Sequence, residues 1–149
     1  MSAGYSGTPL SKKLGVAAGQ RVLTVALPPS VRAELPDDAV YATAGGGPWD
    51  VILHFATEVA ELAAVLPGHM AALAPGRPKR GKDKAEPAGM LWVAWPKKNP
   101  PKGVARLATD ISEDRIRDVA LPLGLVDVKV CAVDDTWSGL KLVVRKELR

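Results

Sequence analysis

The sequence has little of several residue types that define common classes of protein. Its single cysteine, Cys131, cannot form an internal disulfide, which is typical of proteins from a reducing cytoplasm. Its two histidines stand far from that cysteine and without ligand spacing, so we expect no metal site. No apolar run reaches the about 18 residues that cross a bilayer, and the N-terminus lacks the pattern of a secretory signal. We therefore expect a cytoplasmic protein with no membrane contact.

Length and composition are those of one globular domain. Hydrophobic residues make up 47% of the 149 residues and charged residues 24%, which is typical of a folded chain rather than a disordered or membrane-embedded one. We expect a single domain over residues 1–149. Its first part, residues 1–18, has little helical or strand periodicity before Lys13 and is interpreted as an N-terminal arm on the surface.

The positive charge is concentrated in one part of the chain. The net charge is +4, but residues 77–106 alone carry +7 and the remainder −3. Five of these cations, in a stretch that we expect to be a flexible basic loop over residues 75–88, are candidates for contacts with nucleic-acid phosphates: Arg77, Lys79, Arg80, Lys82 and Lys84. The loop holds no aromatic side chain on which bases could stack. A solvated loop is therefore the favoured interpretation, and nucleic acid is not an expected partner.

Short β-branched or apolar runs alternate with helical patterns. The expected strands are 21–27, 39–43, 50–55, 91–95, 126–132 and 140–146. Ser30, Thr57 and Ser112 are each expected to cap a helix that follows, and Pro67-Gly68 should kink the second of them. In the strand over 126–132, the alternating Val126, Val128, Val130 and Ala132 predict one buried face.

The stretch Gly89–Lys98 is the centre of this pattern. It is wholly apolar up to Pro96 and ends in two lysines, as expected for a central strand that is covered on both faces. Trp92 and Trp95 are three residues apart and should face opposite sides of it. The strand before it and the helix between them form a βαβ unit, which predicts parallel strands and a right-handed crossover.

These elements together predict an α/β fold. We expect a Rossmann-like three-layer sandwich, with a mainly parallel sheet of about six strands and an antiparallel C-terminal hairpin. The exposed edge of that hairpin makes a homodimer a candidate assembly.

Three segments resemble a known bacterial family. Residues 5–10, 89–97 and 134–141 are similar to domain-of-unknown-function family 3052, over nearly the whole chain. The order of strands and helices also resembles the C-terminal half of Rossmann-like methyltransferases that use S-adenosylmethionine. The resemblance implies a compact Rossmann-like domain and brings no established activity with it.

The sequence departs from the methyltransferase pattern where the cofactor binds. Those enzymes carry a glycine-rich turn after the first strand and an acidic residue after the second. Here the first turn is residues 26–30, Ala-Leu-Pro-Pro-Ser, and residues 41–47 contain no carboxylate. The triplet Gly45–Gly47 leads into another strand rather than into a helix. We therefore expect no nucleotide cofactor bound in the usual way.

Ligands of open α/β sheets bind beyond the carboxyl ends of the parallel strands. This rule brings residues 28–30, His54, Thr57 and residues 95–98 to one rim. There Trp95 could stack on a planar ligand, and Lys97 and Lys98 could hold a phosphate or carboxylate. The alternative is that the tryptophans are core residues and the lysines are solvated.

Two further candidates each have a structural alternative. His54 could act as a base near the end of its strand, but it has no assigned partner, and burial in the core is the simpler interpretation. The turn at 134–139 contains Asp134, Asp135 and Trp137, which could bind a cation or a ligand. Adjacent carboxylates need not converge on one point, so a turn that is stabilised by local hydrogen bonds is favoured.

These observations favour a cytoplasmic binding or interaction module without ordinary cofactor motifs, rather than an enzyme. It would recognise an anionic small molecule or a protein partner at the 95–98 rim. The first alternative is a divergent methyltransferase-like enzyme that uses His54 and the Asp134–Asp135 turn. The second is weak nonspecific nucleic-acid binding by the basic loop.

Overall fold

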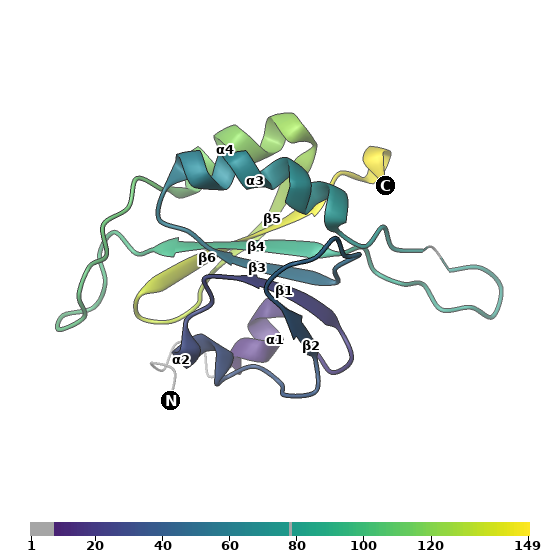
Figure 1. Cartoon of the computed structure of the whole chain (residues 1–149), viewed down its shortest axis with the longest axis horizontal. Coiled ribbons are helices and arrows are strands. Elements are labelled where there is room, and N and C mark those ends of the chain that lie inside the picture. The colour runs from purple at the N-terminus through teal and green to yellow at the C-terminus, as the bar shows by residue number, and fades with distance from the viewer. Residues whose placement is uncertain (1–7, 78) are drawn as a thin grey trace.

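A computed structural model describes residues 8–77 and 79–149. One six-stranded sheet of order β2-β1-β3-β4-β6-β5 organises the chain (Figure 1). The strands are β1 (Arg21–Val25), β2 (Val40–Ala42), β3 (Val51–Phe55), β4 (Met90–Pro96), β5 (Leu125–Ala132) and β6 (Trp137–Val144). The pairs among β2, β1, β3 and β4 are parallel, whereas β4·β6 and β5·β6 are antiparallel. The mainly parallel sheet with a C-terminal hairpin is confirmed.

Helices cover both faces of this sheet. They are α1 (Leu10–Leu14), α2 (Pro29–Arg32), α3 (Val59–Ala72) and α4 (Glu113–Ala120), with the short 3-10 turns η1 (Leu121–Leu123) and η2 (Lys146–Leu148). Figure 1 shows α3 and α4 on one face, and α1 and α2 on the other. We call these the α3/α4 face and the α1/α2 face. The three-layer α/β sandwich is thus confirmed.

The two tryptophans of β4 divide between the two layers. Trp95 packs in the core under α3 and α4, with Leu62, Leu66 and Ile116. Trp92 packs in the opposite core, with Leu14 of α1. Both side chains are buried, because successive side chains of a strand point to opposite faces. The opposite placement predicted from their spacing is confirmed.

The N-terminal stretch is more than a surface arm. Leu10 and Leu14, one helical turn apart in α1, are buried in the core of the α1/α2 face. The indole nitrogen of Trp92 donates a hydrogen bond to the Leu14 carbonyl oxygen at 2.8 Å. The expected arm is therefore wrong for residues 10–14, while residues 1–7 lie outside the described part of the chain.

Helix α3 is continuous through Pro67, where we expected a kink. Pro67 lies on the exposed side of the helix, where water can satisfy the carbonyl group that a proline leaves without a partner. Leu62 and Leu66 are fully buried on the opposite side and hold the helix on the sheet.

The expected caps have mixed outcomes. The Ser112 hydroxyl accepts a hydrogen bond from the Arg115 backbone N–H at 3.3 Å, as predicted for the start of α4. Thr57 does not cap α3; Asp110 does so from a loop 51 residues away, by accepting from the Val59 N–H at 2.8 Å. Helix α2 begins after Pro28 and receives no side-chain cap, so Ser30 does not cap it.

Strand β5 departs from the expected alternation. The pairing with β6 shifts at a β-bulge between Asp127 and Lys129. Val128 is 52% exposed and Val130 46% exposed, because β5 is the last strand of the sheet. The buried face that we predicted from Val126 to Ala132 is thus wrong in its central part. In the described part of the chain, no helix is long and apolar enough to cross a membrane.

Candidate functional site

The carboxyl ends of the parallel strands form the edge where a ligand is expected. In the sheet, β2 lies on one side of β1 and β3 lies on the other side of β1. The switch point of the topology therefore lies between β1 and β3, and open α/β sheets bind ligands at such points.

A pocket of about 610 Å³ lies at this edge, beyond the ends of β1 and β2. Eight residues line it: Thr24, Val25, Ala26, Leu27, Pro29, Arg32, Tyr41 and Thr43. We call it the β1–β2 pocket. Its volume lies within the range of about 300–1,000 Å³ that is usual for small-molecule sites.

Ala26 gives the β1–β2 pocket an unusual backbone. Its φ is +53°, and it is the one non-glycine residue of the described chain with a positive φ. Residues with a Cβ rarely adopt this left-handed conformation, and functional sites are enriched in such strained positions. Ala26 thus takes, directly after β1, a conformation that glycine usually supplies. The absence of glycine from residues 26–30 does not exclude a tight turn there.

Arg32 and Tyr41 form one wall of the pocket. The Arg32 guanidinium carbon lies 4.0 Å from the centre of the Tyr41 ring, and Arg32 Nη1 lies 3.3 Å from the Asp37 carboxylate. The Tyr41 hydroxyl donates to the Pro36 carbonyl oxygen at 2.6 Å. Burial raises the pKa of Tyr41, so this wall is a neutral phenol stacked against a cation.

Hydroxyl groups are the other polar groups of the pocket. Thr24 is buried and its Oγ1 lies 3.4 Å from the Ala42 carbonyl oxygen, while Thr43 follows β2 and is exposed. No carboxylate stands among the described residues that line the pocket. An acidic residue in the usual position after β2 is therefore missing, as the sequence indicated.

The predicted 95–98 rim lies at the same edge of the sheet, at the end of β4. Trp95 is 8% exposed and packs in the core. The Lys97 backbone N–H donates to the Thr136 carbonyl oxygen at 2.8 Å, and Lys98 is exposed. The end of β4 and the β5–β6 turn are thus brought together.

The β5–β6 turn has the structure expected of local hydrogen bonding. One oxygen of Asp134 accepts from the backbone N–H groups of Thr136 and Trp137, each at 2.8 Å. The Trp137 ring meets Phe55 of β3 edge to face, with the ring centres 5.1 Å apart. In this geometry the Asp134 carboxylate holds its own turn, as the structural alternative predicts.

The side chain of His54 lies between β3 and α3. Its side chain is 1% exposed and its Nδ1 lies 2.9 Å from Nε2 of His69 on α3. Its own Nε2 is buried without a hydrogen-bond partner, 3.9 Å from a carboxylate oxygen of Glu61. Burial lowers the pKa of His54; burial, with a contribution from His54, lowers the pKa of His69 to about 4. The pair belongs to the packing between β3 and α3.

Thr57 holds the loop that follows β4. Its carbonyl oxygen accepts from the Thr109 hydroxyl at 2.7 Å, next to the bond between Asp110 and Val59. These two contacts tie the loop over residues 97–111 to the start of α3. Thr57 therefore lies at the predicted rim, but it acts through its backbone.

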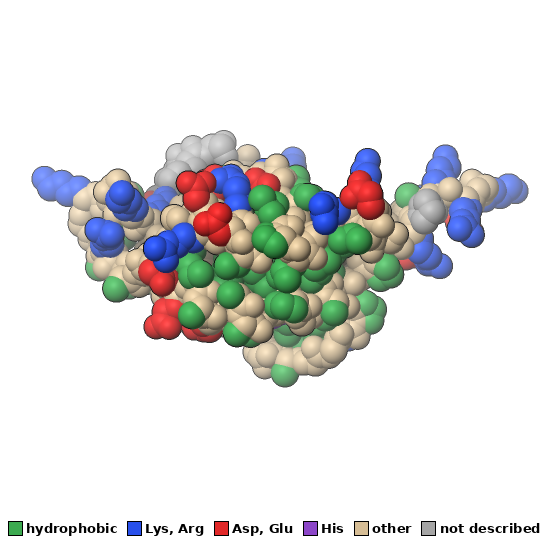
Figure 2. Space-filling view, turned by 90° about the horizontal axis from the view of Figure 1, so that it is seen from above, with side chains coloured by type: hydrophobic (Ala, Val, Ile, Leu, Met, Phe, Trp, Pro, Cys, Tyr) green, Lys and Arg blue, Asp and Glu red, His purple; other side chains and the backbone are tan. Residues whose placement is uncertain are grey.

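The basic loop over residues 75–88 lies at the other end of the molecule. Figure 1 shows it projecting from the amino ends of the strands, opposite the loop over 97–111. Figure 2 shows lysine and arginine side chains gathered on these two projections, with hydrophobic side chains across the middle of the α3/α4 face. The positive segment thus divides into two separate patches.

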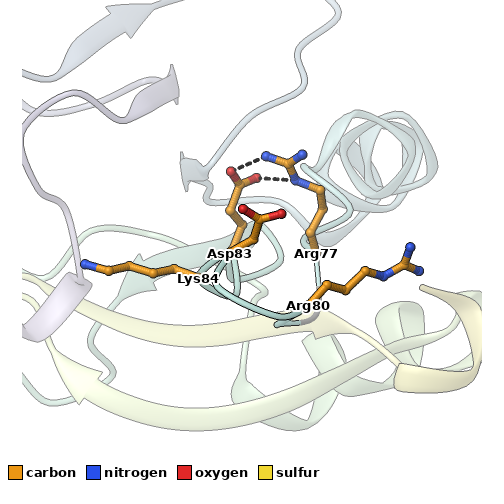
Figure 3. A pocket seen from close by; sticks show the side chains of 5 residues that line it. Arg77, Arg80, Asp83 and Lys84 are labelled. Carbon is orange, nitrogen blue, oxygen red and sulfur yellow. Dashed lines mark hydrogen bonds and ion pairs between the residues drawn. The ribbon is translucent and has the colours of Figure 1, made fainter.

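The cations of this loop do not converge. Arg77 forms a bidentate pair with Glu86, with Nε 3.0 Å from Oε2, and the pair lowers the pKa of Glu86. Around a cavity of about 630 Å³, Arg80 and Lys84 point away from each other (Figure 3). Lys79 and Lys82 are exposed. Their role in nucleic-acid binding stays a prediction.

Sequence reasoning placed residues 28–30 at this rim, but it did not find the pocket. Arg32, Tyr41 and Thr43 belong to no recognisable sequence motif. The residue type of Ala26 does not indicate that its φ is positive. The available signal was the Pro28-Pro29 pair directly after β1, because two prolines fix how the chain leaves the strand.

No protein-family model matches the chain, and no curated protein does either. The resemblance to family 3052 therefore has no support from these comparisons. Among solved structures, a DhpI–SAH complex aligns with a TM-score of 0.54 and 12% identity, over 93% of this chain and 83% of DhpI. The [4+2]-cyclase SpnF aligns with a TM-score of 0.53 and 10% identity, over 91% and 78%.

These comparisons correct our leading functional expectation. We expected a binding module without cofactor machinery, in part because the first turn lacks glycine. The chain instead has the fold of a protein solved with SAH bound, and Ala26 supplies the left-handed turn that the expectation assumed to be missing. The binding-module interpretation is wrong, and the alternative is better supported. At these low identities, what is shown is the fold alone: a Rossmann-like α/β sandwich similar to those of DhpI and SpnF.

Proposed function

We propose that this protein is a divergent methyltransferase-like enzyme that binds S-adenosylmethionine or S-adenosylhomocysteine in the β1–β2 pocket. The observation that carries the proposal is the left-handed Ala26 directly after β1. It stands beside a pocket of sufficient volume at the carboxyl edge of the sheet, beyond the ends of β1 and β2.

The described residues fit an adenosyl group in part. Leu27 and Pro29 offer apolar contacts to a purine, and the turn at Ala26 lets the ligand approach the backbone. The hydroxyl groups of Thr24 and Thr43 are the groups available to the ribose hydroxyls, in place of the missing carboxylate. Arg32 is held by Asp37 and Tyr41, so its charge is partly offset.

S-adenosylmethionine, when bound, would supply an electrophilic methyl carbon. The chain's own part is to hold the ligand and to exclude water around it. The loop over residues 97–111, fixed to α3 by Thr109 and Asp110, stands at the same edge and would position an acceptor. Lys97 and Lys98 begin that loop, and their contact with a ligand stays a prediction.

Calorimetry with S-adenosylhomocysteine tests the proposal. Thr43 is exposed at the pocket, so Thr43→Trp should fill the site without disturbing the core. We expect the wild-type protein to bind, and Thr43→Trp to bind at least about tenfold more weakly, a loss of about 1.4 kcal/mol. Glu34→Trp, an equally large substitution at an exposed residue just after α2 and outside the pocket lining, is the matched control. No binding by the wild-type protein would overturn the proposal.

Narrower statements are also proposals. The resemblance of residues 89–97 and 134–141 supports membership of bacterial domain-of-unknown-function family 3052. The lone Cys131 supports a cytoplasmic location. The unpaired edge of β5, with its exposed Val128 and Val130, supports a homodimer.

A further inference from the structure

Two lysines face each other across the hairpin on the α1/α2 face of the sheet. Lys129 of β5 is directly opposite Lys141 of β6, and Lys141 is directly opposite Trp92 of β4. Residues paired in this way on neighbouring strands share a face of the sheet. Lys129 Nζ lies 5.8 Å from the centre of the Trp92 ring, which confirms the shared face.

This arrangement is unfavourable for the protein alone. Like charges directly opposite each other on neighbouring strands destabilise a sheet. Burial, together with the charge of Lys129, lowers the pKa of Lys141. Among the described residues, neither lysine forms an ion pair. The repulsion is thus not relieved by a neighbouring carboxylate.

The need to keep the edge strand from pairing with other chains explains the presence of only one of the two lysines. An inward-pointing lysine on an edge strand prevents pairing with other chains, and Lys129 on β5 fits that role. Lys141 lies on the inner strand β6 and is only partly exposed. A cation at that position needs another explanation.

Further groups around the pair agree with a site for an anion. Burial raises the pKa of Cys131, while the charges of Lys13 on α1 and of Lys129 act to lower it, which brings a third cation near this face. Lys141 also lines a cavity of about 720 Å³ at the amino edge of the sheet. The two carboxylates of that cavity contact other residues that line it: Asp50 accepts from the Arg21 N–H at 2.8 Å, and Glu86 pairs with Arg77.

We propose that Lys129 and Lys141 bind a doubly charged oxyanion of the phosphate class between them, with Lys13 adding to the positive potential. One dianion would relieve the repulsion of both ammonium groups through charge-assisted hydrogen bonds. The site is on β5 and β6, at the opposite end of the strand order from the β1–β2 pocket. It does not depend on adenosyl binding in that pocket.

Thermal unfolding with inorganic phosphate, at constant ionic strength set with potassium chloride, tests this site. At a phosphate concentration about ten times the Kd, we expect the melting temperature to rise by about 3–5 °C. Lys141→Met keeps most of the apolar stem and removes the charge. It should melt above the wild-type protein without phosphate and lose the phosphate response.

Lys129→Met should also lose the rise in melting temperature that phosphate causes. If Lys141→Met does not fold, Lys129→Met tests the site in its place. Lys146→Met is the matched control, because it removes one exposed lysine from another surface and should keep the full response. A parallel titration with ribose 5-phosphate distinguishes a phosphate ester from the free ion by which of them binds more tightly.

Three results would each overturn the site. Chloride alone could reproduce the rise in melting temperature, which would mean general screening of charge. Lys141→Met and Lys129→Met could both retain the response, or Lys146→Met could lose as much of it as they do.

Discussion

The two faces of the sheet are covered by helices of very different length. On the α3/α4 face, α3 has 14 residues and α4 has eight. On the α1/α2 face, α1 has five residues and α2 has four. The longer helices bury His54 and partly bury His69, although an apolar pocket of about 470 Å³ remains beside the end of α3. The shorter helices are attached to the sheet by few contacts, such as the hydrogen bond from the Trp92 indole N–H to the Leu14 carbonyl oxygen. Residues of α2 also line the β1–β2 pocket. Stability is thus concentrated on one face and candidate ligand groups on the other.

Two leucine truncations test this difference most strongly. Leu66 of α3 is 0% exposed and Leu14 of α1 is 2% exposed, so the two start from equal burial. Leu66→Ala should cost about 3–4 kcal/mol of the free energy of unfolding, since a long packed helix cannot collapse onto the cavity. Leu14→Ala should cost about 2–3 kcal/mol, because the one-turn α1 can shift to fill the space. Urea titrations at constant m-value measure both, and an equal or reversed order would break the comparison.

The contact between the buried His54 and the partly buried His69 should make the α3/α4 face sensitive to acid. The pKa values of His54 and His69 are lowered in the folded protein, so the unfolded chain takes up protons first. The stability from this pair is complete above about pH 6.5 and is lost as the pH falls toward the folded pKa of about 4 for His69. Because His69 is partly exposed, we expect a loss of about 1 kcal/mol across this window.

A pH series of urea titrations measures that loss. In the double variant His54→Gln/His69→Gln, the free energy of unfolding should depend less steeply on pH between about 6.5 and 4. The carboxylates titrate in both proteins and contribute equally to the two curves. A wild-type slope in this window no steeper than that of the variant would contradict the prediction.

Removal of the long-range cap on α3 should have an effect as small as that of the histidine pair. Asp110→Ala leaves the Val59 N–H without its partner and should cost about 1 kcal/mol, the usual value for a lost N-cap. Ser112→Ala, which removes the local cap of α4, is a matched control of similar size. Only Asp110→Ala should also loosen the loop over residues 97–111, which limited proteolysis can detect. Equal loosening in both variants would show that the cap does not hold the loop.

The sequence predicted those elements whose causes are local. The apolar stretch of β4 with its two opposed tryptophans, and α4 with Ser112 as its cap, each follow from residues within one turn or one pleat. Their outcome depends little on what packs around them.

The features that escaped prediction depend on distant parts of the chain. The cap of α3 comes from Asp110, 51 residues from its partner, and nothing near Thr57 indicates it. The bulge in β5 depends on its pairing with β6, and the exposure of Val128 and Val130 depends on β5 being the last strand of the sheet. For Ala26, the surrounding fold imposes a backbone angle that its residue type disfavours. The β1–β2 pocket was missed for the same reason.

The bond between Asp110 and Val59 also makes one backbone amide a reporter of movement. The Val59 N–H is the first of α3, and a first-turn amide usually exchanges its hydrogen with water quickly, because it has no partner inside the helix. Here its partner belongs to the loop that follows β4, at the same edge of the sheet as the candidate site. When the loop moves away from α3, the Val59 amide loses its hydrogen-bond partner and can exchange its hydrogen with water. The hydrogen-exchange rate of this amide therefore reports how often the loop opens.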